Sequence, residues 1–158
     1  MLKIIIKISL VISSFIIINF LLYKLAYRES REQERLYENH SNARINLFII
    51  YDYQFLFKKN ITKDLNNNKI GENGTINELA NYEIVKEKNS SENFLTSLKI
   101  INKGKGLSGY DFKIFIPNDI NLAESYWCCY AFPLEYPETG KSAFFINETG
   151  KLWKSIDG

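Results

Sequence analysis

Residues 109–156 read GYDFKIFIPNDINLAESYWCCYAFPLEYPETGKSAFFINETGKLWKSI, and this stretch decides the expected fold. From Tyr110 to Ile116 every second residue is large and apolar, and Pro117 ends the run. Such alternation is typical of a strand that buries one of its two faces. The stretch is therefore expected to open with a half-buried strand.

Three more strands are expected downstream. Tyr126–Phe132 is apolar on both faces, as a central strand would be, and stops at Pro133. Ser142–Asn147 and Lys151–Ile156 follow as strands around a tight turn at residues 148–150. Successive strands with short connections predict an antiparallel meander.

A helix upstream is expected to cover one face of this sheet. Apolar residues recur there at three- and four-residue intervals, which is the spacing of a buried helical stripe. The stripe and the two residues that follow it are Ala43, Leu47, Ile50, Tyr51, Gln54 and Phe55. Residues 39–42 could interrupt the helix, so the pattern is compatible with one long helix or with a jointed one.

The N-terminal segment is uncharged from Ile8 to Tyr23, close to the ~20 residues of a transmembrane helix when Ile4–Ile6 are added. A cleaved signal peptide would need a small residue three positions before the cut. The best candidate bond follows Ala26, and Lys24 occupies that position. We therefore expect an uncleaved single-pass anchor. Its membrane-facing residues include Ile8, Phe15, Phe20 and Tyr23.

The expected organisation has three parts. Residues 1–26 form the anchor in the cytoplasmic (inner) membrane, with the N-terminus inside. Residues 27–42 form a charged helical stalk, and residues 43–158 form an α+β globular domain outside the cytoplasm. The aromatic content of 15% supports a real core, and the net charge of +2, spread over interleaved acids and bases, argues against nucleic acid as a partner.

Few residues suggest chemistry. Cys128 and Cys129 are adjacent in an expected strand, so they should point to opposite faces, with one thiol buried and one facing outward. His40, the only histidine, lies in a polar stretch and is expected to be a solvated surface imidazole. No spacing pairs two carboxylates, so we expect no enzyme and no catalytic residue.

An Asn-rich loop covers residues 64–75. Asp64, Asn66 and Asn68 alternate as in a calcium loop, and Glu72 adds a carboxylate. However, the sixth position is Lys69 instead of Gly and the twelfth is Thr75 instead of Glu. No cofactor is expected, with a calcium or small-ligand sensor as the alternative function. Residues from Thr75 to Leu79 are expected to form a capped helical turn that docks on the core.

Three blocks resemble the type IV pilin-like and type II secretion pseudopilin domains of bacteria, and the last also resembles an uncharacterised secreted bacterial family. The blocks are DLNNNKIGENGTINEL (64–79), GYDFKI (109–114) and the ending from Tyr130 to Gly150. The resemblance implies a membrane helix running into a soluble helix packed on a meander. Met1–Tyr23 contains neither the Gly nor the Glu of the pilin processing site, so the fold is implied more than membership of a pilus.

The expected function is a non-enzymatic, membrane-anchored, pilin-like interaction module. Its partners would be the lipid bilayer and either other pilin-like or secretion-system proteins or further copies of itself. Large aromatic residues are the natural contact points of such a module, although most serve in packing. The candidate contact residues are Tyr126, Trp127, Tyr136 and Trp153.

Overall fold

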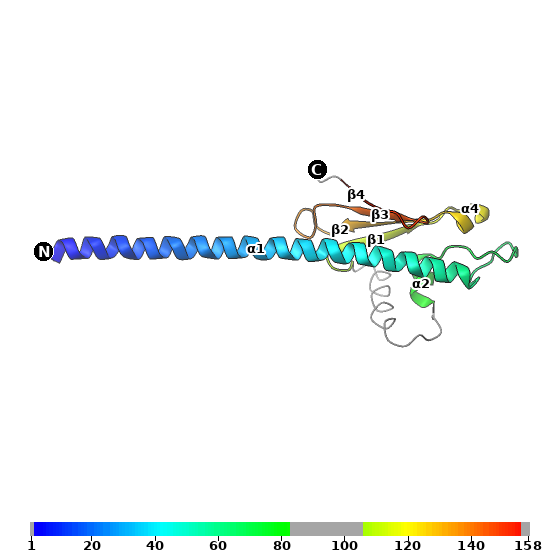
Figure 1. The fold of residues 1–158 in the computed structure, drawn as a ribbon, viewed down its shortest axis with the longest axis horizontal. Coiled ribbons are helices and arrows are strands. Elements are labelled where there is room, and N and C mark those ends of the chain that lie inside the picture. The colour runs from blue at the N-terminus through cyan, green and yellow to red at the C-terminus, as the bar shows by residue number, and fades with distance from the viewer. Residues whose placement is uncertain (1, 83–105, 156–158) are drawn as a thin grey trace. The chain divides into compact units, whose positions relative to one another are not determined.

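The computed structural model describes residues 2–82 and 106–155, without the side chains of residues 2–11. The protein is α+β, as expected, with one long N-terminal helix and a four-stranded antiparallel sheet (Figure 1). In chain order the elements are α1 (Leu2–Lys59), α2 (Ile76–Asn81), β1 (Tyr110–Phe115), α4 (Ile120–Ser125), β2 (Cys128–Pro133), β3 (Phe144–Asn147) and β4 (Leu152–Lys154).

The sheet is the expected meander, because its strands pair in chain order β1-β2-β3-β4 and every pair is antiparallel. Phe112 lies opposite Ala131, and Ala131 lies opposite Phe144. All three are buried, so one face of the sheet is the core face. The strands are shorter than expected, and Ile156 lies outside the described residues.

Helix α1 is continuous through residues 39–42, which decides between the two helix alternatives. The chain divides into two compact units, Met1–Arg35 and Leu36–Gly158. In the first unit the described apolar side chains are exposed, and Arg28 pairs with Glu32 one turn later at 3.0 Å. Within the part of the chain that the structure describes, no helix is both long and apolar enough to cross a membrane.

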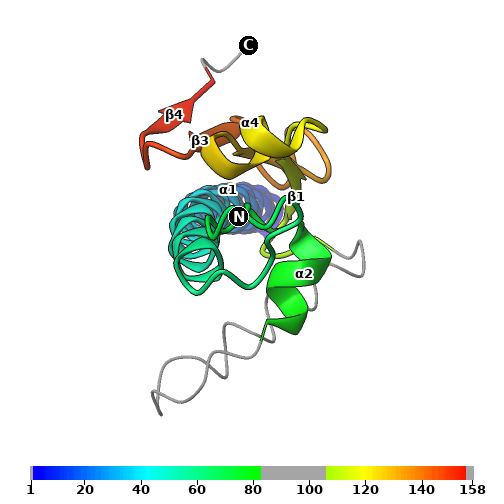
Figure 2. The same ribbon diagram turned by 90° about the vertical axis from the view of Figure 1, so that its right-hand side faces the viewer.

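The core of the second unit lies between α1 and the sheet. Ala43, Leu47 and Ile50 are fully buried, and the stripe continues through Gln54 to Phe57. Figure 2 shows α1 end-on, with the strands of the sheet along one side of it. Phe55 was expected to extend the stripe but is 59% exposed. The reason is helical geometry, because one residue beyond Gln54 is a rotation of about 100° away from the core.

Two short helices complete the unit. Thr75 caps α2, accepting the Glu78 N–H, while Glu78 accepts the Thr75 N–H in return. Leu79 is fully buried, so the expected capped turn and its docking are confirmed. Helix α4 was not expected. Its signal was Asp119, whose carboxylate accepts the backbone N–H groups of residues 121 and 122.

Candidate functional sites

The outward face of the sheet carries an aromatic row. Tyr130, Phe145 and Trp153 are successive cross-strand partners on β2, β3 and β4. The ring centroids are 4.7 Å apart for Tyr130 and Phe145, and 5.0 Å apart for Phe145 and Trp153. Because side chains alternate along a strand, this row lies on the face opposite the core.

Two more rings widen the row. Phe115 on β1 meets Tyr130 edge-on at 5.7 Å, and Phe132 stacks on Tyr130 at 5.6 Å with planes 7° apart. Phe115 is 54% exposed, and Phe132 and Trp153 are each 37% exposed. We call the five rings the aromatic face: Phe115, Tyr130, Phe132, Phe145 and Trp153.

Two shallow hollows adjoin the aromatic face, and Phe145 lines both. The first, of about 480 Å³, is also lined by Phe115, Tyr126 and Cys128. The second, of about 420 Å³, is lined by Tyr130, Phe132 and Trp153 among others. Both linings are predominantly apolar, so the hollows suit apolar side chains.

Charged side chains of both signs lie at the rim, including Glu148, which lines the first hollow. The Lys151 ammonium lies 5.3 Å from the centre of the Trp153 ring, within range of a cation–π interaction. Lys113, the cross-strand neighbour of Tyr130, lies 3.9 Å from the Asp111 carboxylate. Lys151 therefore lies over one ring of the aromatic face, and Lys113 is paired with an acid beside that face.

The second candidate site is the Asn-rich loop, which is polar. The Asp64 carboxylate accepts the backbone N–H groups of Asn68 at 3.2 Å and Lys69 at 3.0 Å. Asn67 and Lys69 both adopt positive φ, 58° and 66°. Lys69 therefore makes the sharp turn at the sixth position although it is not Gly.

The loop is also tied to α4. The side-chain amides of Asn66 and Asn68 donate to the same oxygen, Oε1 of Glu124, at 2.7 and 2.8 Å. Glu72 is buried, and its Oε1 accepts the Leu65 N–H at 2.7 Å. Among the described residues, no three acidic, histidine or cysteine side chains are gathered closely enough to hold a metal ion.

Comparisons with known proteins do not identify either site. No family model, curated protein or solved structure matches the chain.

The four contact residues expected from the sequence lie in different parts of the structure. Trp153 belongs to the aromatic face, and Tyr126, 54% exposed, lines the first hollow. Trp127 is buried, with its ring 6.2 Å from that of Tyr51, so it serves the core. Tyr136 is exposed on the β2–β3 loop, outside the aromatic face.

Sequence reasoning missed the centre of the aromatic face, Tyr130 and Phe145. Tyr130 stood inside a run that was apolar on both faces, and Phe145 stood beside an equally apolar Phe144. The alternation in β1 identifies the core face of that strand, but the faces of β2 and β3 follow only from the register between strands. The sequence does not give the register of β2, β3 and β4, which is what identifies the outward residues of these strands.

The two cysteines are placed as expected. Cys129 is fully buried in the core, whereas Cys128 is half-buried on the outward side, and both are free thiols. Burial raises the pKa of Cys128, and the negative charge of Glu148 raises it further. Burial raises the pKa of Cys129 far above its ordinary value. Both thiols are therefore less reactive than an ordinary cysteine, and Cys128 is the more reactive of the two.

The expectation for His40 was wrong. Its Nε2 accepts the backbone N–H of Lys141 at 3.1 Å, and its ring meets those of Tyr110 and Phe144 edge-on at 6.0 and 5.6 Å. The neighbouring Asn39 also contacts the β2–β3 loop, because its side-chain amide donates to the Thr139 carbonyl at 2.9 Å. The imidazole therefore joins α1 to the β2–β3 loop.

The membrane-facing candidates of the first unit are exposed in the structure. Phe15, Phe20 and Tyr23 are 69%, 57% and 68% exposed, and the Lys24 ammonium lies 5.1 Å from the centre of the Phe20 ring. Ile8 lies in α1, and its side chain is outside the described set.

Proposed function

We propose that this chain is a membrane-anchored, extracytoplasmic interaction module, with a pilin-like arrangement, whose aromatic face binds a partner protein at the same membrane. The observation that carries the proposal is the unbroken contact of five rings across the outward side of a four-stranded sheet. Binding is its role in this proposal, and no catalytic step is assigned to it.

A protein partner suits this surface for energetic reasons. Large aromatic side chains lose little conformational freedom on binding and bury much area, so they dominate protein–protein contacts. A contiguous exposed apolar patch lowers the solubility of a protein. Such a patch therefore indicates a binding site. The hollows on either side of Phe145 would admit a partner's apolar side chains, and the lysines at the rim would favour acidic groups around them.

The membrane anchor rests on the first unit. The run from Ile8 to Tyr23 has no charged residue, and the described part of it exposes apolar side chains on every side of the helix. A helix that is hydrophobic all round needs a core or a bilayer to cover it. The pilin-like part of the proposal is supported by the long N-terminal helix and the antiparallel meander that follows it.

Site-specific photo-crosslinking in native membranes tests the binding face. A photoreactive phenylalanine analogue replaces Trp153 or Phe132, and a control replaces Leu65, which is 60% exposed on the Asn-rich loop. We expect a crosslinked band to a second protein from both face positions and none from the control. A band at twice the chain mass alone would replace the partner with a second copy. Equal crosslinking from all three positions would contradict a specific face.

Membrane extraction tests the anchor separately. The full chain should stay with the membrane at alkaline pH and leave it only with detergent, because its attachment is hydrophobic. N-terminal sequencing of the extracted protein should begin before Ala26. A mature chain that begins after Ala26, or that fractionates freely, would remove the anchor from the proposal.

A further inference from the structure

The two hollows beside the aromatic face differ in the sign of their charge. Among the described residues, the first is lined by one charged residue, Glu148, and by neither lysine nor arginine. The second is lined by Lys154, and the Lys151 ammonium lies over the Trp153 ring of that hollow. Opposite charges at two ends of a binding surface select the orientation of a partner. The first hollow therefore favours a positively charged group.

The Glu148 carboxylate has only a weak partner within the protein. Among the described residues, no lysine or arginine lies within ion-pair distance of it. It accepts a long hydrogen bond, 3.5 Å from the side-chain amide of Asn147. Lys58 and Glu148 both line a third, smaller hollow, but the Lys58 ammonium donates to the Glu124 carbonyl. The carboxylate therefore keeps acceptor sites for a cation from another molecule.

Glu148 is placed to act on a group bound in the first hollow. It follows β3 directly, is half-buried, and lines the hollow together with Cys128. Burial raises the pKa of the Cys128 thiol, and the negative charge of Glu148 raises it further. Partial burial also reduces screening by water, so Glu148 attracts a cation more strongly than a fully solvated carboxylate does.

The aromatic walls of the first hollow suit a guanidinium group. Phe115 and Tyr126 are each 54% exposed, and Trp127 and Phe145 complete the aromatic lining. The faces of aromatic rings attract cations, and a guanidinium stacks on them because it is planar and weakly hydrated. The methylene groups of an arginine would lie against the apolar wall. Lysine carries a compact, strongly hydrated charge and gains less from such a wall.

We propose, on the basis of the binding role assigned above to the aromatic face, that the first hollow receives an arginine side chain of the partner protein. The guanidinium lies between the aromatic rings and the Glu148 carboxylate. Acidic groups of the partner then face the second hollow, on the other side of Phe145, where Lys154 lies. A partner with this pattern of charges has one favoured orientation on the sheet.

Titration with N-acetyl-arginine amide tests the hollow directly. The two tryptophans of the chain line different hollows, Trp127 the first and Trp153 the second. In NMR spectra of the full chain in detergent micelles, millimolar ligand at constant ionic strength should shift the indole N–H signal of Trp127 and not that of Trp153. Trp153→Phe assigns the two signals.

The uncharged analogue N-acetyl-citrulline amide is the matched control ligand. It should shift the Trp127 signal less than about a third as far at the same concentration, because it has the shape of arginine without the charge. No response of Trp127 to the arginine ligand, or an equal response to the citrulline ligand, would overturn the proposal.

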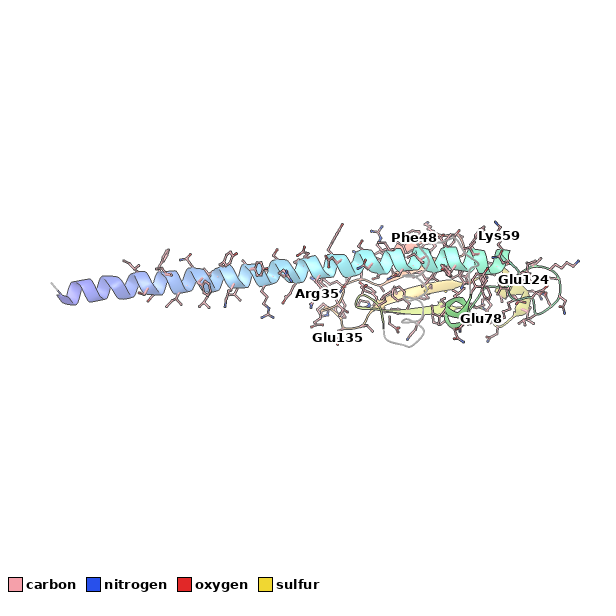
Figure 3. All side chains as sticks on the ribbon, turned by 90° about the horizontal axis from the view of Figure 1, so that it is seen from below. Arg35, Phe48, Lys59, Glu78, Glu124 and Glu135 are labelled. Carbon is pink, nitrogen blue, oxygen red and sulfur yellow. The ribbon has the colours of Figure 1, made fainter. Side chains whose placement is uncertain are left out.

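Two glutamine variants test the role of the carboxylate. Glu148→Gln should weaken binding of the arginine ligand at least about threefold, because it removes the charge and keeps the shape. Glu135→Gln should bind like the wild type, since Glu135 lines neither hollow. Figure 3 shows Glu135 far from Glu124, whose neighbour Ser125 lines the third hollow with Glu148. Equal affinities of Glu148→Gln and the wild type would overturn the proposal.

The photo-crosslinking assay distinguishes the arginine site from the binding face as a whole. Glu148→Gln should at least halve the yield of the partner band from the Phe132 position, and Glu135→Gln should leave it unchanged. An undiminished band in Glu148→Gln would overturn the arginine contact and leave the binding face in place. If the wild type gives no partner band while arginine still shifts the Trp127 signal, the binding face is wrong and the arginine site remains.

Discussion

The Tyr110 side chain fills the space that a side chain at Gly140 would need. A Cβ placed on Gly140 would overlap the Tyr110 hydroxyl and lie 2.7 Å from its Cζ atom. The hydroxyl donates to the Ser142 carbonyl at 2.8 Å, and Tyr110 is fully buried. The start of β1 and the β2–β3 loop, 30 residues apart in sequence, are thus locked together by one ring.

Gly140→Ala should therefore lower the free energy of unfolding by about 1–3 kcal/mol, the usual cost of overpacking. Tyr110→Phe should cost about 1–2 kcal/mol through the lost hydrogen bond to the Ser142 carbonyl. The double variant should lose less than the sum, because the phenylalanine ring lacks the overlapping oxygen. Chemical denaturation of the four proteins measures this cycle, and strictly additive losses would contradict the close approach.

Gln54 should be the most sensitive polar residue of α1. Its side-chain amide pairs with both backbone groups of Gly74, at 2.6 and 2.7 Å, in a buried position. Gln54→Leu leaves a donor and an acceptor without partners and should cost about 2–5 kcal/mol. Gln33→Leu is the matched control, because Gln33 is exposed on the same helix. Similar stability of the two variants would show that this pairing is dispensable.

His40→Ala should destabilise the second unit by about 2 kcal/mol, because it removes an acceptor and two ring contacts. The affected partners are the Lys141 N–H and the rings of Tyr110 and Phe144. Glu38→Ala, on the exposed side of α1, should change stability by less than about 0.5 kcal/mol. If His40→Ala is as stable as the wild type, the contacts of the imidazole do not stabilise the second unit.

Maleimide labelling should separate the two cysteines. Cys128 should react slowly in the folded protein at pH 8, and Cys129 only after unfolding, because thiolate is the reactive form and burial raises both pKa values. Glu148→Gln should speed labelling of Cys128 at least about twofold. Removing the carboxylate lowers the Cys128 pKa, so more thiolate is present at the same pH.

The labelling rate is measured by mass spectrometry of the intact chain. Glu135→Gln serves as the charge-matched control on a different loop and should leave the rate unchanged. Labelling of Cys129 before Cys128 in the native protein would contradict the placement of the two thiols. An unchanged rate in Glu148→Gln would mean that burial alone sets the reactivity of Cys128.

Local patterns in the sequence were sufficient for the class of fold. Alternation from Tyr110 to Ile116 identified β1 and its core face, and the spacing of Ala43, Leu47 and Ile50 identified the buried side of α1. The cap at Thr75 and the opposite faces of the cysteines followed from the same kind of reasoning. These features depend on residues within a few positions of one another, so the sequence alone determined them.

The candidate sites depended on tertiary structure. The register of β2, β3 and β4 brings Tyr130, Phe145 and Trp153 into one row. The packing of α4 brings Glu124 to a loop more than 50 residues earlier in the chain. Neither arrangement has a local pattern, because each arises from the packing of segments far apart in sequence. The sequence determined which elements form, and their packing decided which side chains meet.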